Sequence, residues 1–323
     1  MKIVDMHGDS VYQMLKKRRN GVPCGFAKND LHMDIEKMKS ADYLLQNFAL
    51  FVDQGECEDP YEEAKAEYAV FQEEMEKNKD AISQVFCYED ILKNQKEGKL
   101  SALLTLEEGE ICKGEIKKLE EFYGYGARMM ALTWNYDNSL STANANKTPW
   151  KRTYTGNRAG LTETGIEFVE RMEELGMIPD VSHMSDEGIE DLLQIAKKPF
   201  AASHSNARNL CGHPRNLTDE FLRRMGEKGC VIGVNFSSGF LKENTNFSEN
   251  EWIADHILYM VNVAGIESVG FGTDFDGISC GLEMENCSNM QVLVDVLKQR
   301  GMTESQIEHI FYKNVLRIYK ELL

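Results

Sequence analysis

The segment IVDMHGDSVY, residues 3–12, begins as an apolar strand and then carries Asp5, His7 and Asp9 at every second position. In a strand, residues i and i+2 lie on the same face, so these three side chains are expected to point the same way. Buried carboxylates and imidazoles need partners, and a divalent cation is the usual one. The segment therefore indicates a metal site, with an acidic surface strand as the alternative.

The composition narrows the classes of partner. The chain has 323 residues, with 36 Lys plus Arg against 53 Asp plus Glu, which leaves a net charge of −17. This balance disfavours binding to nucleic acid or to an anionic membrane. No secretory leader is recognisable, and no apolar run approaches the roughly 20 residues of a membrane span. The eight cysteines are scattered without a CxxC pair, which is typical of reduced thiols. We expect a cytoplasmic protein.

The order of apolar runs predicts the fold. Eight strand-like runs alternate with amphipathic helical segments, which is the pattern of a (β/α)₈ TIM-like barrel. The predicted strands are 3–7, 43–52, 102–107, 128–133, 177–183, 200–204, 230–236 and 268–275. Clear helical segments are 61–78, 163–175, 186–196 and 250–264, and capping-box spacing occurs at Ser248–Glu251 and Thr303–Gln306. We expect one domain over residues 1–323. A doubly wound open sheet is the alternative, although no Gly-rich phosphate loop follows the first strand.

Polar residues follow the predicted strands at the end where a barrel carries its chemistry. They are His7 and Asp9 after the first strand, Glu107 at the third, His183 at the fifth, His204 at the sixth and Asp274 at the eighth. A closed barrel would bring all of them to one mouth. Three imidazoles and three carboxylates exceed the needs of one tetrahedral zinc and suit a pair of metal ions, with Glu107 as a bridge. A single buried histidine is more often a core residue than a ligand, but six polar residues at strand ends together favour a metal site.

Five motifs together resemble one known family. D-x-H-x-D at 5–9, D-V-S-H at 180–183, S-H-S at 203–205, R-N-L at 215–217 and G-T-D-F-D-G at 272–277 are similar, in this order, to the membrane dipeptidase family, peptidase family M19. The resemblance implies a metal-dependent hydrolase barrel that holds two zinc ions and cleaves small dipeptides. Other divalent metals and a homodimeric assembly remain open.

The resemblance also implies a role for each matched residue. His7 and Asp9 would hold one zinc ion, His183 and His204 the other, and Glu107 would bridge them. Arg215 would bind the terminal carboxylate of the substrate, and Asp274 would be the catalytic acid near the scissile amide. Without the resemblance, the residues alone favour a surface ion pair for Arg215.

Two positions depart from the family pattern. Glu108 stands beside Glu107 where the family usually has Gly. In LTWNYDN, residues 132–138, Trp134 occupies the place of a usual His that contacts the substrate and its oxyanion, whereas Asn138 matches a frequent Asn. We expect Trp134 and Asn138 to contact the substrate, with packing against the barrel rim as the alternative for Trp134. The rival functions are a hydrolase of N-acyl amino acids and a metal-retaining barrel with little activity that serves for binding.

Overall fold

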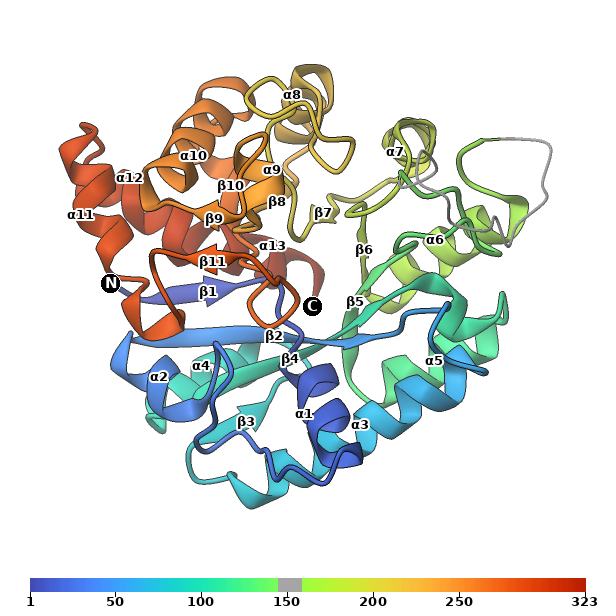
Figure 1. Cartoon of the computed structure of the whole chain (residues 1–323). Coiled ribbons are helices and arrows are strands. Elements are labelled where there is room, and N and C mark those ends of the chain that lie inside the picture. Colours follow the sequence, from blue (N-terminus) through green and yellow to red (C-terminus); the bar gives the residue numbers. More distant parts are fainter. Residues whose placement is uncertain (145–158) are drawn as a thin grey trace.

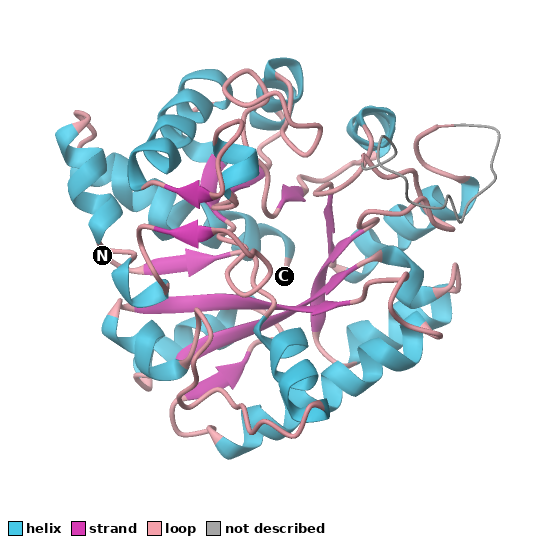
Figure 2. Cartoon of the chain, viewed as in Figure 1, coloured by secondary structure: helices cyan, strands magenta, loops and turns pink. Residues whose placement is uncertain are grey.

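The structure is a computed structural model that describes residues 1–144 and 159–323. Its centre is a ring of parallel strands surrounded by helices (Figures 1 and 2). The ring strands are β1 (Ile3–Asp5), β2 (Tyr43–Phe51), β4 (Leu100–Glu107), β5 (Ala127–Ala131), β6 (Ile178–Asp180), β7 (Ala201–Ala202), β8 (Val231–Val234) and β10 (Val269–Phe271).

The pairing of the strands closes the ring. Neighbours follow the order β2-β1-β10-β8-β7-β6-β5-β4, and β2 pairs with β4 from Leu45↔Ser101 to Phe51↔Glu107. This last pairing excludes the open sheet and confirms the predicted (β/α)₈ barrel. The strands are buried along their whole length, as parallel strands covered by helices must be.

Most helices connect one ring strand to the next and cover the outside of the barrel. They are α1 (Ser10–Arg19), α2 (Ile35–Ser40), α3 (Pro60–Lys77), α4 (Tyr88–Lys96), α5 (Ile116–Gly124), α6 (Glu163–Leu175), α7 (Asp186–Ile195), α8 (Asp219–Glu227), α9 (Ser238–Leu241), α10 (Asn250–Ala264), α11 (Val292–Gln299), α12 (Glu304–Glu308) and α13 (Asn314–Leu322). Side-chain caps start several of them. Asp59, for example, accepts from the backbone N–H of Tyr61 ahead of α3, which has Pro60 at its first position.

Short elements supplement the barrel. β3 (Ile82–Gln84) pairs with the start of β4, and β9 (Phe247–Ser248) pairs with β11 (Gly281–Leu282). The 3₁₀ turns Gly109–Cys112, Ile266–Ser268 and Cys287–Asn289 and the π-helical turn His309–Lys313 complete the described elements. The first of these turns follows β4 directly and so begins beside Glu107.

Helix α13 packs against the end of the barrel where the strands begin. A hydrophobic cluster joins its residues Val315, Ile318 and Tyr319 to residues of β1, β2, β4, β5, β6, β7 and β8. The Tyr319 hydroxyl also donates to Asn47 of β2 at 2.9 Å. The opposite end, where the strands finish, is thereby left as the open mouth.

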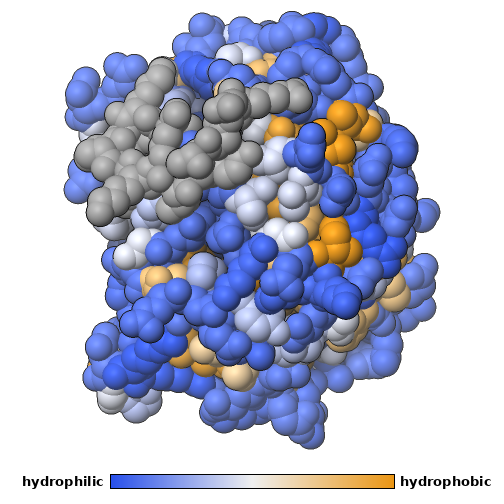
Figure 3. Space-filling view, turned by 90° about the vertical axis from the view of Figure 1, so that its right-hand side faces the viewer, coloured by the Kyte–Doolittle hydropathy of each residue, from blue (hydrophilic) through white to orange (hydrophobic). Residues whose placement is uncertain are grey.

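None of the helices in residues 1–144 and 159–323 is long and apolar enough to cross a bilayer. Figure 3 views the molecule from the side of α6 and α7, and shows a mostly hydrophilic face with small, separate apolar patches.

Candidate metal centre and substrate cavity

The structure brings all six predicted strand-end residues together at the mouth of the barrel. His7 and Asp9 follow β1, Glu107 ends β4, His183 follows β6, His204 follows β7 and Asp274 follows β10. All six side chains are buried or nearly so, and Asp274 is the most exposed at 14 %. Parallel strands in a closed ring force this meeting, since their carboxyl ends share one rim.

Glu107 lies at the centre, and its two carboxylate oxygens face different partners. Oε2 is 3.2 Å from His7 Nε2, whereas Oε1 is 3.2 Å from His183 Nε2 and 3.4 Å from His204 Nε2. On the first side, His7 Nε2 is also 3.6 Å from Asp9 Oδ2 and 3.9 Å from Asp274 Oδ1. The cluster therefore divides into two groups of ligand atoms that share one carboxylate.

Neighbouring polar groups orient two of the histidine rings. His183 Nδ1 is 3.0 Å from Asn135 Oδ1, and His204 Nδ1 is 2.7 Å from the Ser203 hydroxyl, which in turn donates to Asp180. A histidine that uses Nδ1 in this way presents Nε2 to the site, which is the usual arrangement of metal-ligating imidazoles. In this structure the Nε2 atoms of His183 and His204 lie 3.0 Å apart.

Burial and charge set the protonation of the cluster. Burial lowers the pKa of His183 to about 3 and that of His204 well below the usual range, so both rings are neutral and able to ligate. Burial and the Glu107 charge raise the pKa of Asp9 to about 8. Burial by itself would raise the pKa of Glu107. The His7 charge and the hydrogen bonds from His183 and His204 outweigh this effect and hold the pKa of Glu107 well below the usual range.

The donor set fits divalent metal ions. His7 Nε2 and Asp9 Oδ1 are buried, and neither has a hydrogen-bond partner among the described residues. Two sets of three residues each place one ligand atom per residue within 4.8 Å of the others. These sets are His7, Glu107 and His204, and His7, Asp9 and Asp274. Imidazole nitrogens and carboxylate oxygens are the ligands of catalytic zinc sites, and a cation would satisfy the orphaned atoms.

The backbone of the site is locally strained. His183 has φ 72° and Asp274 has φ 63°, so both adopt the left-handed conformation that L-residues avoid. Gly277 is a further site residue that the sequence analysis did not single out. A methyl group at this position would overlap the carboxylates of Asp9 and Asp274. Its one signal in the sequence is its position at the end of the G-T-D-F-D-G motif.

Arg215 is a buried cation next to this cluster. It donates from Nη1 to the Ser205 hydroxyl at 3.3 Å and from Nη2 to the His204 carbonyl at 3.1 Å, and its Nε has no hydrogen-bond partner among the described residues. No described carboxylate lies within ion-pair distance of it, although Asp274 and Glu107 act on it electrostatically at longer range. Burial lowers the pKa of Arg215 to about 10. The surface ion pair considered from sequence is therefore wrong, and the guanidinium remains available to an anion.

A cavity of about 310 Å³ opens above the cluster. Asp9, Glu107, His183 and Asp274 line its floor, and Trp134, Asn135 and Phe240 are among its walls. The Trp134 ring packs edge-on against Phe51 with ring centroids 4.9 Å apart, and lies 6.0 Å from the His183 ring. Trp134 thus reaches the cavity and also packs against its rim.

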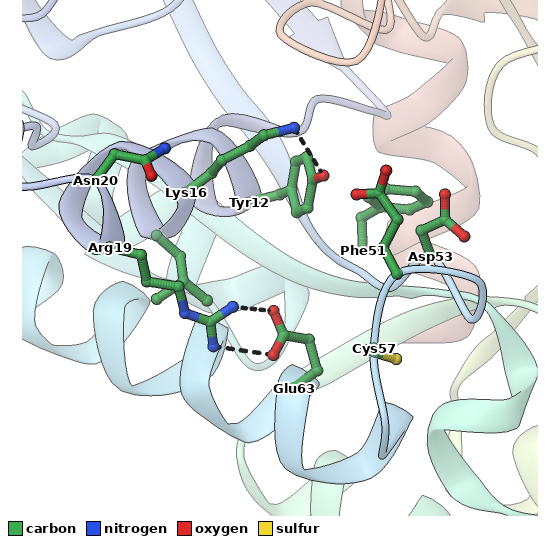
Figure 4. Close-up of a pocket in the computed structure, with 10 residues that line it drawn as sticks. Tyr12, Lys16, Arg19, Asn20, Phe51, Asp53, Cys57 and Glu63 are labelled. Atoms are coloured by element: carbon green, nitrogen blue, oxygen red, sulfur yellow. Dashed lines mark hydrogen bonds and ion pairs between the residues drawn. The ribbon is translucent and has the colours of Figure 1, made fainter.

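A second lobe of about 260 Å³ adjoins the cavity beside α1 and the loop after β2 (Figure 4). Tyr12, Lys16, Phe51, Asp53 and Glu56 line both spaces, so the two spaces are direct neighbours. At the far end of this second lobe, Figure 4 shows the paired guanidinium of Arg19 and carboxylate of Glu63.

Asn138 occupies a different place from the predicted one. Its side chain is buried and does not line the cavity, and both ends of its amide are used by neighbouring backbone groups and by Glu108. Oδ1 accepts from the backbone N–H groups of Leu140 and Ser141, and Nδ2 donates to the Leu132 carbonyl and to Glu108. The asparagine of this loop that lines the cavity is Asn135, which the sequence analysis did not predict to contact the substrate.

Comparisons with known proteins identify the same family that the sequence motifs resemble. The family model of membrane dipeptidase (peptidase family M19) matches residues 1–322. An uncharacterized dipeptidase of Schizosaccharomyces pombe is 32 % identical over 99 % of this chain and 80 % of its own length. A metallopeptidase from Rhodobacter sphaeroides, solved with a phosphinate mimic of L-Ala-D-Ala, has a TM-score of 0.89 at 20 % identity and covers 100 % of this chain and 99 % of its own. The probable dipeptidase PvdM from Pseudomonas aeruginosa has a TM-score of 0.86 at 19 % identity, over 99 % of this chain and 94 % of its own. With its whole length matched by the family model and its strand-end residues gathered at one mouth, the chain belongs to the membrane dipeptidase family, peptidase family M19.

Proposed function

We propose that the protein is a dipeptidase that uses two zinc ions to hydrolyse the amide bond of small dipeptides. The observation that carries the proposal is the position of Glu107, whose two oxygens face two separate groups of ligand atoms. His7 and Asp9 would hold one ion, His183 and His204 the other, and Glu107 would bind both. Bound divalent ions polarise a carbonyl oxygen and lower the pKa of water, so the reaction needs no Ser or Cys nucleophile.

Asp274 is the proposed general base and acid. Its Oδ2 accepts from Asn235 at 2.9 Å, which fixes the carboxylate and leaves Oδ1 facing the cluster. From this position Oδ1 would accept the proton of the attacking water and return it to the departing amine.

Arg215 is the proposed binding group for the substrate's free carboxylate. A buried guanidinium without a carboxylate partner among the described residues favours an anionic ligand, and its fork suits a carboxylate. Arg215 follows β7, which lies across the barrel from β2 in the strand order. The amino-terminal residue of a dipeptide would then lie toward the loop after β2, beside Asp53 and Glu56.

These two acids also bear on the rival reaction. A free ammonium group is attracted by Asp53 and Glu56, whereas an N-acyl group would gain nothing from them. The phosphinate mimic of L-Ala-D-Ala in the Rhodobacter sphaeroides structure supports a dipeptide ligand and extends the proposal to a D-residue at the carboxyl side.

The test combines metal analysis with a substrate panel. Zinc-loaded protein is analysed for metal content and assayed on L,L- and L,D-dipeptides and on their N-acetyl forms. We expect two ions per chain and cleavage of the free dipeptides. One ion or none would contradict the two-zinc site, and preferred cleavage of the N-acetyl forms would favour the hydrolase of N-acyl amino acids. Two bound ions without any hydrolysis would favour the binding barrel.

A further inference from the structure

Glu108, the residue after the central Glu107, is a buried carboxylate with no role in the proposed reaction. It is fully buried and does not line the cavity. Successive residues at a strand end point in opposite directions, so Glu107 faces the mouth while Glu108 faces the loop after β5. No described cation lies within ion-pair distance of it, and its oxygens are used by hydrogen-bond donors instead.

Those donors belong largely to one loop, residues 132–138. Glu108 Oε2 accepts from the backbone N–H of Trp134 at 3.0 Å, and Oε1 accepts from the side-chain amide of Asn138 and from the backbone N–H of Glu110 at 2.9 Å. Since Asn138 also donates to the Leu132 carbonyl at 2.9 Å, the carboxylate and the amide together hold both ends of the loop.

The same loop supplies two residues of the cavity. Trp134 forms part of the wall, and Asn135 lies 3.0 Å from His183 Nδ1. A displacement of the Trp134 backbone would therefore move the indole relative to Phe51 and to the His183 ring, against which it now packs.

A glutamate at position 108 lowers the stability of the fold for two reasons. Its φ of 99° lies in the region that favours glycine, and a buried carboxylate carries a desolvation penalty. Glycine would remove both costs, but it would also remove the carboxylate that accepts from the Trp134 N–H and from the Asn138 amide. The geometry thus links an unfavourable residue to the placement of one cavity wall.

We propose that Glu108 is a positioning residue that sets the substrate preference of the enzyme by holding Trp134 against the cavity. The inference rests on the proposed dipeptidase activity for its kinetic test, but the position of the indole can be measured without it. The expected substrate effect is on the choice of side chain beside the scissile bond, because the indole limits the space there.

The experiment compares Glu108→Gly and Glu108→Gln with Trp134→Ala and the double variant Glu108→Gly/Trp134→Ala. Glu173→Gln is the matched control, because Glu173 is also a buried carboxylate that accepts from two backbone N–H groups, those of Lys197 and Lys198. Metal content is checked for each protein. The kinetic readout is the ratio of kcat/KM between dipeptides with a small and a bulky amino-terminal residue.

We expect Glu108→Gly to change this ratio by about tenfold, the scale of a reshaped apolar pocket. The change should disappear when Trp134 is already Ala, since coupled residues are not additive. Glu108→Gln keeps one acceptor oxygen and should have a smaller effect, and Glu173→Gln should have none. Full additivity of the two changes, or an equal loss on both substrates, would overturn the proposal.

A spectroscopic readout separates this proposal from the proposed function. The Trp134 contribution to acrylamide quenching is obtained by subtracting the matching Trp134→Phe protein, because the chain has three tryptophans. Release of the loop in Glu108→Gly should increase the quenching of Trp134. If Glu108→Gly folds poorly, Glu108→Gln carries the same comparison. A wild-type protein that cleaves no dipeptide would refute the proposed function alone, whereas unchanged quenching in both variants would refute the role of Glu108.

Discussion

Replacing Arg215 with Met tests whether the buried guanidinium binds the substrate's carboxylate. Two of its five N–H donors are already used, by Ser205 and by the His204 carbonyl, and Nε has no partner among the described residues. A fork of two donors therefore remains for a carboxylate. The methionine side chain keeps much of the volume and the contact with Phe240 but removes the charge.

The expected size of the effect follows from this geometry. A hydrogen bond to a charged group contributes about 1.5–3 kcal/mol. At about 1.4 kcal/mol per factor of ten, KM for free dipeptides should rise about 10- to 140-fold in Arg215→Met. C-terminally amidated dipeptides never make this bond, so their KM should change far less.

The assay measures amine release from each free dipeptide and its amide, with metal content checked in every preparation. Arg215→Lys serves as the control that keeps the charge without the fork, and it should fall between the wild type and Arg215→Met. Equal loss on free and amidated substrates would refute the carboxylate role and would make Arg215 a structural residue.

Four further predictions follow from the site and its surroundings. Glu107→Gln should weaken binding of the metal pair far more than Glu108→Gln, as measured by elemental analysis after dialysis; equal loss would mean that the wrong glutamate is assigned. Trp134→His should raise kcat on L,L-dipeptides, because a lost oxyanion donor costs on the order of 10²–10³ in rate; unchanged rate and substrate ranking would place Trp134 outside the working site. Gly277→Ala should reduce metal content or activity because the methyl group would push the Asp9 and Asp274 carboxylates apart, and full retention of both would contradict the crowding seen here. Buried Glu67 has an Oε1 without a hydrogen-bond partner among the described residues, and burial raises its pKa well above 4.5. The neutral carboxyl therefore stabilises the fold below pH 4.5, and this stability is lost as the pH rises through the raised pKa. Thermal unfolding of Glu67→Gln should show a Tm advantage over the wild type that grows with pH above 4.5, and a pH-independent difference would refute this.

The barrel could be predicted from the sequence because its strands are continuous apolar runs between amphipathic helices. Each of the eight predicted runs overlaps a ring strand, and the helices predicted at 163–175 and 250–264 have the observed bounds. The strands that were missed, β3, β9 and β11, have only two or three residues, too few to show a period. The capping box at Thr303–Gln306 is confirmed, but the one at Ser248–Glu251 is wrong: α10 begins at Asn250, and Ser248 belongs to β9.

The meeting of the candidate metal ligands at one mouth could be anticipated for a related reason. His, Asp and Glu residues that follow predicted strands can be recognised in the sequence. Closure of the barrel then brings the ends of these strands together. Asn135 and Asn138 could not be told apart in this way, since both are loop asparagines and only the turn geometry decides which of them faces the cavity. The same limit applies to Glu108, whose contacts with Trp134 and Asn138 depend on a backbone angle that no local pattern predicts.

The left-handed backbone at His183 and Asp274 has a consequence for laboratory evolution of this protein. An L-residue in this conformation costs roughly 1–2 kcal/mol, and glycine would relieve it. A selection for thermal stability alone would therefore accept glycine at these two positions and lose a candidate ligand and the candidate acid in the process. Selection for heat resistance and for turnover pull in opposite directions here, so a stabilised variant has to find its gains elsewhere in the barrel.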